Sequence, residues 1–325
     1  MKTRVLFAGS PAIAVPAFEI LCSLDEIEMA GALTNPDSPK GRRGTPQATE
    51  VGEAAERISQ TFERQGRAAF PVLKPLKLDA LLREQISSLK PDLLVSFAYG
   101  HIFGPKFLAL FPLGGINIHP SLLPKYRGPA PIQAAILNRD SVTGITVQTL
   151  AKEMDCGDIL SRENLRLTGE ETAGSLNEIV AQKAALMLPA LLGNIAAGTA
   201  RPVPQDNSEA SYCSLITKAD GFIDWNKSAA EIEARIRAFN PWPLCRTIHN
   251  GRELLILKSA VKQGGADMDC GKPGLVLGID KQDGILIQTG EGILAVRELQ
   301  YQKKKALLWR DFLNGTRDFT GSRLG

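Results

Sequence analysis

An amide and an imidazole stand two residues apart in the segment Gly-Ile-Asn117-Ile-His119-Pro-Ser-Leu-Leu-Pro. Apolar residues flank Asn117 and predict a buried strand over 115–118, and Pro120 and Pro124 exclude a regular helix or ladder directly after it. Side chains two residues apart on a strand project from the same face. Asn117 could therefore stabilise a developing oxyanion while His119, which titrates near neutral pH, transfers a proton. A buried amide and a satisfied histidine at a strand end are the alternative interpretation.

Two carboxylates near a glycine form a second segment suited to chemistry, Met-Asp155-Cys-Gly-Asp158. The alternating residues 144–150 predict a strand that ends just before this loop. Asp158 precedes a further predicted strand from Ile159 and could simply end the turn. Asp155 lies deeper in the loop and could reach an imidazole. Asp155 is therefore the candidate partner of His119.

Alternating strands and helices precede these segments. Strands are expected over 4–8, 28–33, 69–73 and 93–97, the first and last of them buried, and helices over 16–24, 47–65, 79–89 and 105–110, with Asp79 as an N-cap. This alternation predicts a mostly parallel sheet with helices on both faces, whose strands end at one ligand-binding edge. The opening is Rossmann-like, but Ser10 and Pro11 follow Gly9 where a G-x-G-x-x-G fingerprint would continue, which argues against a dinucleotide site.

A basic loop is expected at this edge. Residues 34–46 contain three prolines, two glycines and the cations Lys40, Arg42 and Arg43. This composition predicts no regular element, so the segment is expected to be an exposed, mobile, positive loop. A solvated turn is the ordinary explanation, but its place beside the expected active edge favours binding of a polyanion.

The second half of the chain has a different pattern. A long apolar helix over 172–197 is expected to close a first domain over 1–197, and residues 198–211 have the composition of a linker. In the second domain, over 212–325, the sequence predicts a helix at 229–239 and another at 307–313. Short β segments separated by glycine-containing turns predict a small barrel there, over 245–248, 254–258, 275–279, 284–288 and 293–299.

The composition limits the class of protein. At 325 residues, with 44% hydrophobic and 22% charged residues, the chain is typical of a globular protein of two domains. No apolar run approaches the roughly 20 residues that span a bilayer, and the N-terminus does not resemble a signal peptide. The five Cys form no C-x-x-C pair, and the three His are widely separated. We therefore expect a cytoplasmic protein without a metal or a membrane partner.

The two chemical segments together resemble the signature of the folate-dependent formyltransferases. They supply Asn117-x-His119-Pro-Ser-Leu-Leu-Pro and Asp155 in Met-Asp-x-Gly-Asp. The resemblance extends over nearly the whole chain. It includes Phe-Ala-Gly-Ser-Pro at 7–11, Asn-Pro-Asp at 35–37, Ala-Tyr-Gly at 98–100, Tyr-Arg-Gly-Pro-Ala-Pro-Ile-Gln at 126–133, Ile-Asp-Trp at 223–225 and Ile-Arg-Ala-Phe-Asn-Pro-Trp-Pro at 236–243.

The resemblance implies an activity and three catalytic residues. Family members transfer a formyl group from 10-formyltetrahydrofolate to an amine. The basic loop and the C-terminal segments favour the α-amine of methionine esterified to initiator tRNA, a step of translation initiation. Asn117 would then donate to the oxyanion, His119 would carry the proton from the attacking amine to the leaving nitrogen, and Asp155 would orient or polarise the imidazole. No metal is required.

The resemblance also implies binding residues. Folate would contact Ser121, Leu122, Leu123 and Pro124, together with Ala98, Tyr99 and Gly100. The tRNA would contact Lys40, Arg42 and Arg43 of the basic loop through its phosphates. The second domain resembles an OB-like barrel that binds tRNA. Lys303, Lys304 and Lys305 there are either part of the tRNA surface or merely solvated, and the chain is expected to be a monomer.

Three other functions remain open at this level. A formyltransferase for an amino sugar nucleotide would share the three catalytic residues, but the basic loop and residues 240–243 argue against it. A hydrolase of formylfolate would not need a positive loop. A nucleic-acid binding module with an inactive centre would not need the three residue types together.

Overall fold

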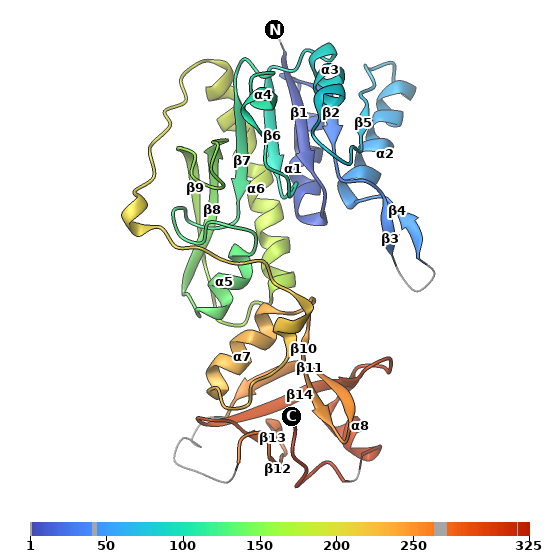
Figure 1. Cartoon of the computed structure of the whole chain (residues 1–325), viewed down its shortest axis with the longest axis vertical. Helices are drawn as coiled ribbons and strands as arrows, with labels where there is room; N and C mark the ends of the chain where they lie inside the picture. Colours follow the sequence, from blue (N-terminus) through green and yellow to red (C-terminus); the bar gives the residue numbers. More distant parts are fainter. Residues whose placement is uncertain (1, 41–43, 263–271, 317) are drawn as a thin grey trace. The chain divides into compact units, whose positions relative to one another are not determined.

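The computed structural model describes residues 2–40, 44–262, 272–316 and 318–325, except for the side chain of Lys40 (Figure 1). The chain forms two compact units. The first contains residues 1–131, 142–166 and 177–213, and the second contains residues 132–141, 167–176 and 214–325. Each unit is built on one large sheet. The domain limits at 197 and 211 stay a prediction, because the second unit also takes two short segments from the first half of the chain.

The first unit contains a seven-stranded sheet. Its strands are β1 (Thr3–Gly9), β2 (Ile27–Leu33), β5 (Val72–Leu73), β6 (Leu93–Phe97), β7 (Gly115–His119), β8 (Val142–Thr149) and β9 (Ile159–Arg166). They lie in the order β5-β2-β1-β6-β7-β8-β9, parallel from β5 to β7 and antiparallel from β7 to β9. The predicted mostly parallel, Rossmann-like sheet is confirmed. The antiparallel pairing places His119, at the end of β7, opposite Thr146 of β8.

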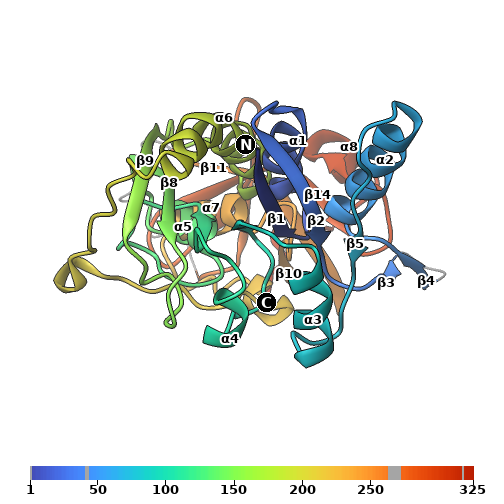
Figure 2. The same ribbon diagram turned by 90° about the horizontal axis from the view of Figure 1, so that it is seen from above.

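Helices cover both faces of this sheet. They are α1 (Val15–Ser23), α2 (Glu50–Arg64), α3 (Ala80–Ser88), α4 (Pro105–Leu108) and α6 (Ala173–Ala196), whereas α5 (Pro131–Leu137) lies almost wholly in the second unit. Figure 2 shows α1 and α6 on one face and α3 and α4 on the other. The N-caps follow the residue types, because the Asp79 carboxylate accepts from Leu82 N–H and the Thr49 hydroxyl accepts from Gly52 N–H. The predicted cap at Asp79 is confirmed.

Helix α6 is long and apolar enough, by length and composition, to cross a membrane. The expectation that no apolar run reaches that length is therefore wrong for this segment. Leu176, Val180, Ala184, Leu188 and Leu192, spaced by four residues, are buried. This stripe is that of a helix packed into a protein core.

The predicted basic loop contains a hairpin. Strands β3 (Ser38–Lys40) and β4 (Thr45–Gln47) pair antiparallel, with Pro39 opposite Pro46. The expectation of no regular element is therefore wrong for its ends. Two prolines can face one another where an antiparallel ladder makes no hydrogen bond, so they do not prevent pairing of the residues on either side. Lys74 anchors the base of the hairpin with ion pairs to Asp37 and Glu56.

The second unit contains a six-stranded antiparallel sheet. Its strands are β10 (Cys245–His249), β11 (Arg252–Val261), β12 (Val276–Asp280), β13 (Gly284–Gln288), β14 (Ile293–Tyr301) and β15 (Leu307–Leu308), in the order β10-β11-β14-β13-β12 with β15 on β14. Helices α7 (Ala229–Ala238) and α8 (Trp309–Asn314) accompany it, and Ser228 and Glu231 form a capping box at the start of α7. The prediction of a second, β-rich domain is confirmed, and its sheet is antiparallel.

Candidate active site

Strands β7 and β8 bring four polar side chains together. Asn117 lies opposite Gln148, and His119 lies opposite Thr146. Residues directly opposite in an antiparallel pair project from the same face, and so do residues two apart on one strand. All four side chains therefore share one face of the sheet at the carboxyl end of β7. The sequence predicted the pair on β7, but not its neighbours on β8.

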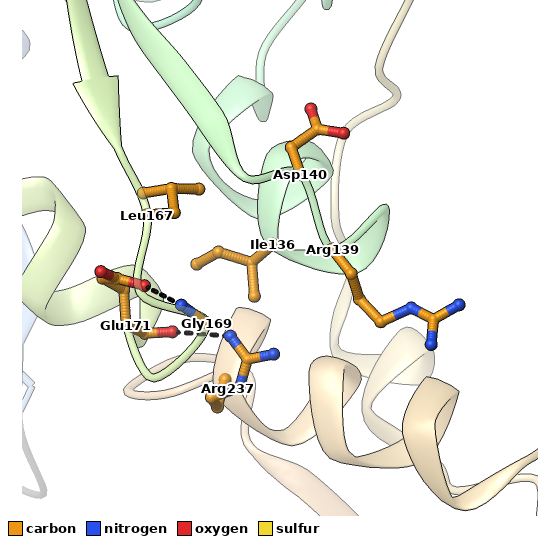
Figure 3. Close-up of a pocket in the computed structure, with 7 residues that line it drawn as sticks. All are labelled: Ile136, Arg139, Asp140, Leu167, Gly169, Glu171 and Arg237. Atoms are coloured by element: carbon orange, nitrogen blue, oxygen red, sulfur yellow. Dashed lines mark hydrogen bonds between the residues drawn. The ribbon is translucent and has the colours of Figure 1, made fainter.

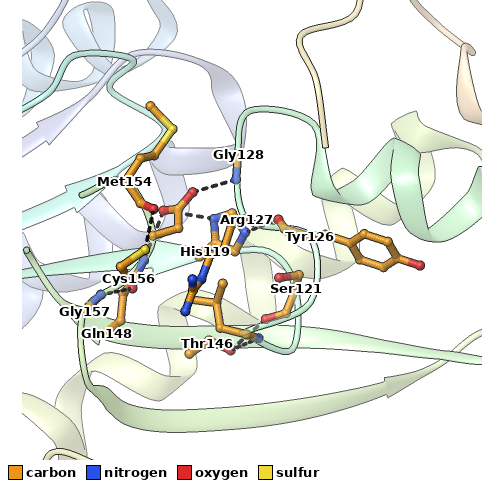
Figure 4. Close-up of polar contacts among 12 residues, drawn as sticks. His119, Ser121, Tyr126, Arg127, Gly128, Thr146, Gln148, Met154, Cys156 and Gly157 are labelled. Carbon is orange, nitrogen blue, oxygen red and sulfur yellow. Dashed lines mark hydrogen bonds and ion pairs between the residues drawn. The ribbon is translucent and has the colours of Figure 1, made fainter. Parts of the chain in front are cut away.

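His119 is held by contacts at both ring nitrogens (Figure 4). Its Nε2 lies 2.9 Å from the Tyr126 carbonyl oxygen, and its Nδ1 lies 3.5 Å from Oδ1 of Asp155. A carbonyl oxygen can only accept, so Nε2 carries the proton of the neutral ring. The lone pair is then on Nδ1, which faces the carboxylate. Protonation of Nδ1 would produce an ion pair with Asp155.

His119 is 4% exposed, and this burial has a direct effect on its charge. Burial lowers the pKa of His119 below its ordinary value, while the Asp155 charge and the hydrogen bond to the Tyr126 carbonyl act in the opposite direction. The ring is therefore neutral at neutral pH. A neutral imidazole with a free lone pair is a proton acceptor, and the adjacent carboxylate stabilises the cation that forms.

The Asp155 carboxylate is fixed in position. Its Oδ2 accepts from Gly128 N–H at 2.9 Å, and its Oδ1 accepts from Gln148 Nε2 at 3.1 Å. The residue has a φ of 55°, a left-handed conformation that only surrounding contacts keep populated in a residue other than glycine. The structure thus brings together Asp155 and His119.

Asn117 differs from its neighbours in having an uncommitted side chain. It is half-buried, and among the residues that the structure describes its amide has no hydrogen-bond partner. A polar group left unpaired beside a held histidine is available to a substrate. Asn117 and His119 are therefore on one face, with the amide free to donate.

The predicted folate loop at 121–124 is shaped by internal contacts. Ser121 is fully buried and its hydroxyl donates to the Lys125 carbonyl at 2.5 Å. The Thr146 hydroxyl donates to the Ser121 carbonyl and accepts from Leu123 N–H. Leu123 is 1% exposed, Leu122 is half-buried, and the Leu123-Pro124 peptide bond is cis. The side chains of Ser121 and Leu123 therefore set the shape of the loop.

The second predicted folate segment, 98–100, follows β6. Ala98 and Gly100 are exposed and have positive φ values of 51° and 83°. Tyr99 is 2% exposed and stacks on Phe103, and its buried hydroxyl has no hydrogen-bond partner among the residues that the structure describes. Its carbonyl accepts from Asn35 Nδ2 at 3.2 Å, so this loop contacts the segment before the basic hairpin.

The predicted tRNA residues occupy separate parts of the chain. Lys40 ends strand β3, whereas Arg42 and Arg43 lie outside the described residues. Lys303, Lys304 and Lys305 are exposed in the turn after β14, in the second unit. Lys303 has a φ of 66°. Their contact with tRNA stays a prediction.

A cavity in the second unit contains none of the predicted site residues. It is lined by Ile136, Arg139, Asp140, Leu167, Gly169, Glu171 and Arg237 (Figure 3). The Arg237 side chain in this cavity already has partners, because it donates to the Glu171 carbonyl and forms an ion pair with Glu233. In the described part of the chain, no three His, Cys, Asp or Glu side chains are grouped so that they could hold a metal ion.

The sequence did not reveal the groups that hold His119 and Asp155 in place. Gln148 fixes Asp155, the Tyr126 carbonyl fixes His119, and Gly128 has a φ of 117° close to Cys213. The 126–133 stretch was part of the resemblance, which was a signal for its loop. Nothing in the sequence pattern pointed to Gln148, because its neighbour on β7 depends on the strand order.

Comparison with known proteins identifies the family. The model of the family described as formyl transferase matches residues 3–192, and that of the formyl transferase C-terminal domain matches residues 215–317. The chain belongs to the formyl transferase family. The resemblance of the sequence to these enzymes, and the prediction that the chain is a transferase, are confirmed.

One curated relative is the methionyl-tRNA formyltransferase of Treponema denticola, which is 48% identical over 97% of this chain and 98% of its own length. Solved structures share the fold. HypX from Aquifex aeolicus, in complex with tetrahydrofolic acid, has a TM-score of 0.62 at 18% identity over 98% of this chain, which spans about half (48%) of HypX. WlaRD, a sugar 3N-formyl transferase, has a TM-score of 0.63 at 19% identity over 94% of this chain and 100% of its own.

Proposed function

We propose that this chain transfers the formyl group of 10-formyltetrahydrofolate to the α-amino group of methionyl initiator tRNA, giving N-formylmethionyl-tRNA for translation initiation. The observation that carries the proposal is the buried His119–Asp155 pair beside the uncommitted amide of Asn117. Full-length similarity to a methionyl-tRNA formyltransferase selects the acceptor. The enzyme works in the cytoplasm as a monomer, without a metal or a membrane partner.

The reaction forms one carbon–nitrogen bond and breaks another. The α-amine attacks the formyl carbon, the formyl oxygen gains negative charge, and the bond to the folate nitrogen then breaks. Asn117 donates to that oxygen, and one such donor contributes about 3 kcal/mol. An amine is already a competent nucleophile, so no covalent intermediate with the enzyme is needed. Cys156, next to Asp155, has no role in this scheme.

His119 carries the proton from the amine to the folate nitrogen. Nδ1, whose lone pair is free in the neutral ring, accepts the proton that the amine releases, and Asp155 stabilises the resulting imidazolium. The ring then returns the proton to the departing folate nitrogen. Acid–base help of this kind contributes on the order of 10²–10⁴-fold. Because burial keeps His119 neutral before the reaction, the base is ready at neutral pH.

The folate lies along the edge formed by residues 98–100 and 121–124. Exposed main chain at Ala98 and Gly100 offers donors and acceptors to a pterin ring, and the packed residues Ser121 and Leu123 keep the second loop in shape. The tRNA binds through the cations of the 40–43 segment and, in the second unit, of residues 303–305. Phosphate contacts of this kind supply affinity and make it sensitive to salt.

A transfer assay tests the proposal. Labelled formyl on 10-formyltetrahydrofolate is offered with methionyl initiator tRNA and, in parallel, with an amino sugar nucleotide. Label on the tRNA alone is the expected result, and a purified His119→Ala variant should lose transfer while still binding tRNA. Label on the sugar alone would refute the choice of acceptor but keep the catalytic residues. Near-normal turnover by His119→Ala would refute the role of the imidazole.

A further inference from the structure

A segment far along the chain is fastened to the catalytic loop. Residues 124–128 and 211–213 exchange main-chain hydrogen bonds, from Arg127 N–H to the Ser211 carbonyl at 2.8 Å and from Cys213 N–H to the Arg127 carbonyl at 2.9 Å. The Ser211 hydroxyl accepts from Tyr126 N–H at 2.9 Å. The Tyr126 carbonyl that fixes His119 is therefore in a loop that the segment after α6 holds in place.

Gln205, which precedes Ser211 in the stretch after α6, contacts the Asp155 loop. Its Nε2 donates to the carbonyl oxygens of Gly157 at 2.7 Å and Asp155 at 2.9 Å, and lies 3.2 Å from Oε1 of Gln148. Its Oε1 accepts from Arg127 Nη2 at 2.8 Å and from Nε at 3.1 Å. Gln205 therefore bridges the two loops that hold His119 and Asp155.

The donors and acceptors of this hydrogen-bond network can be assigned in only one way. A guanidinium can only donate, so the Gln205 oxygen must face Arg127 and its NH₂ must face the two carbonyls. Gly157 N–H donates to the Gln148 oxygen at 3.0 Å, which turns the Gln148 NH₂ toward Asp155. The direction of each hydrogen bond, from Arg127 to the Asp155 carboxylate, thus follows from the one before it.

Arg127, at the start of this series of hydrogen bonds, is a buried charged residue. It is 3% exposed, and its side-chain partners among the described residues, Gln205, Asn207 and Tyr212, are all neutral. A buried charge with no opposite charge as partner is unfavourable and needs several hydrogen bonds. A neutral side chain could link the two loops, so we attribute the buried guanidinium to the direction that it imposes on these hydrogen bonds.

We propose that Gln205 is a positioning residue for formyl transfer, which holds Asp155 at the distance and angle that stabilise protonated His119. The inference rests on the proposed function, and it assigns no contact between Gln205 and either substrate. The left-handed backbone of Asp155, with its φ of 55°, needs such support, because its carbonyl is one of the groups that Gln205 holds. Without that hydrogen bond, only Gly128 N–H and Gln148 Nε2 would hold the carboxylate beside Nδ1, and its position would be less precise.

Two variants test this role. Gln205→Glu keeps an oxygen for Arg127 but places a second oxygen against two carbonyls, and Gln205→Met keeps the length and removes every hydrogen bond. Each should lower kcat by about 10²-fold, since small misplacement of a catalytic group has that effect. The KM values for folate and tRNA should change by less than about threefold. Asn207→Ala is the matched control, because it removes one acceptor from Arg127 without touching the Asp155 loop.

A second readout does not depend on turnover. The titration of His119, followed by NMR in the folate-free enzyme, should move to lower pH in Gln205→Met, because the charge of Asp155 raises the pKa of that ring. An unchanged titration, a kcat within threefold of wild type, or an equal fall in Asn207→Ala would overturn the inference. If the wild-type enzyme transferred no formyl group to tRNA, the proposed function would fail, while the titration would still decide the role of Gln205.

Discussion

Replacing Asp155 with Asn tests the electrostatic part of the site. The carboxylate Oδ1 lies 3.5 Å from His119 Nδ1. At that distance, and with an effective dielectric constant of about 20, two unit charges attract by roughly 4–5 kcal/mol. Full loss of that attraction from the protonated state corresponds to about a 10³-fold fall in rate.

The substitution also changes the hydrogen bonding of the ring. If the Asn oxygen keeps the Gly128 N–H, its NH₂ faces Nδ1 and occupies the lone pair that should receive the proton. If it is turned the other way, Gly128 N–H loses its acceptor. Both orientations lower the rate, and the first adds to the electrostatic loss.

The assay is single-turnover formyl transfer with both substrates saturating, measured between pH 5.5 and 8.5. We expect the single-turnover rate constant to fall about 10³-fold, and the acid limb of the profile to move to lower pH, because Asp155 raises the pKa of His119. Asp158→Asn, the same change three residues on, is the matched control and should stay near wild type. A fall of less than tenfold, or an acid limb that does not move, would refute the reasoning.

Three further predictions address the amide, the loop and the pH dependence of stability. Asn117→Ala should lower kcat by about 10²–10³-fold. Its melting temperature should stay close to wild type, because the amide has no partner among the described residues; a large drop in thermal melts would show that Asn117 is structural. Gly157→Ala should abolish transfer and lower the melting temperature, since an added Cβ would lie 1.7 Å from the Thr149 carbonyl oxygen. Gly193→Ala, in open space on α6, is the control and should stabilise the fold by about 0.5–1 kcal/mol. Stability should also fall as the pH drops below about 6.5: burial lowers the pKa of His119 in the folded state, so the unfolded chain binds the extra proton first. Urea unfolding of wild type should therefore lose more free energy than His119→Gln between pH 7.5 and 5.5, and equal losses would contradict the assignment.

The elements that local sequence determines were predicted well. The continuous apolar run of β6 gave the observed limits, Leu93–Phe97, and the N-cap at Asp79 gave the start of α3. Strand pairing was harder to predict from the sequence. The hairpin of β3 and β4 was missed because two prolines argued against a ladder, and only their register, opposite one another, makes them compatible with it.

The site residues also fall into those that local sequence predicts and those that depend on strand pairing and chain path. Asn117 and His119 share a strand, so their common face followed from a two-residue spacing. Gln148 and Gln205 reach Asp155 only because β8 runs antiparallel to β7 and because the segment after α6 returns to the catalytic loop. Such partners are 7 and 50 positions from Asp155 in the sequence. No periodicity in the sequence records them.

The arrangement of His119 resolves two opposing requirements on one ring. A base for an amine must be neutral before the reaction, which burial ensures by lowering the pKa of His119. The same burial would make the imidazolium too unstable to form unless a charge faced the nitrogen that accepts the proton. The Tyr126 carbonyl assigns that role to Nδ1 by holding the proton of the neutral ring on Nε2, and Asp155 lies on the Nδ1 side. Without the Tyr126 carbonyl, the neutral ring could place its proton on Nδ1 toward Asp155, and the nitrogen that faces the carboxylate would then have no lone pair to accept the proton of the amine.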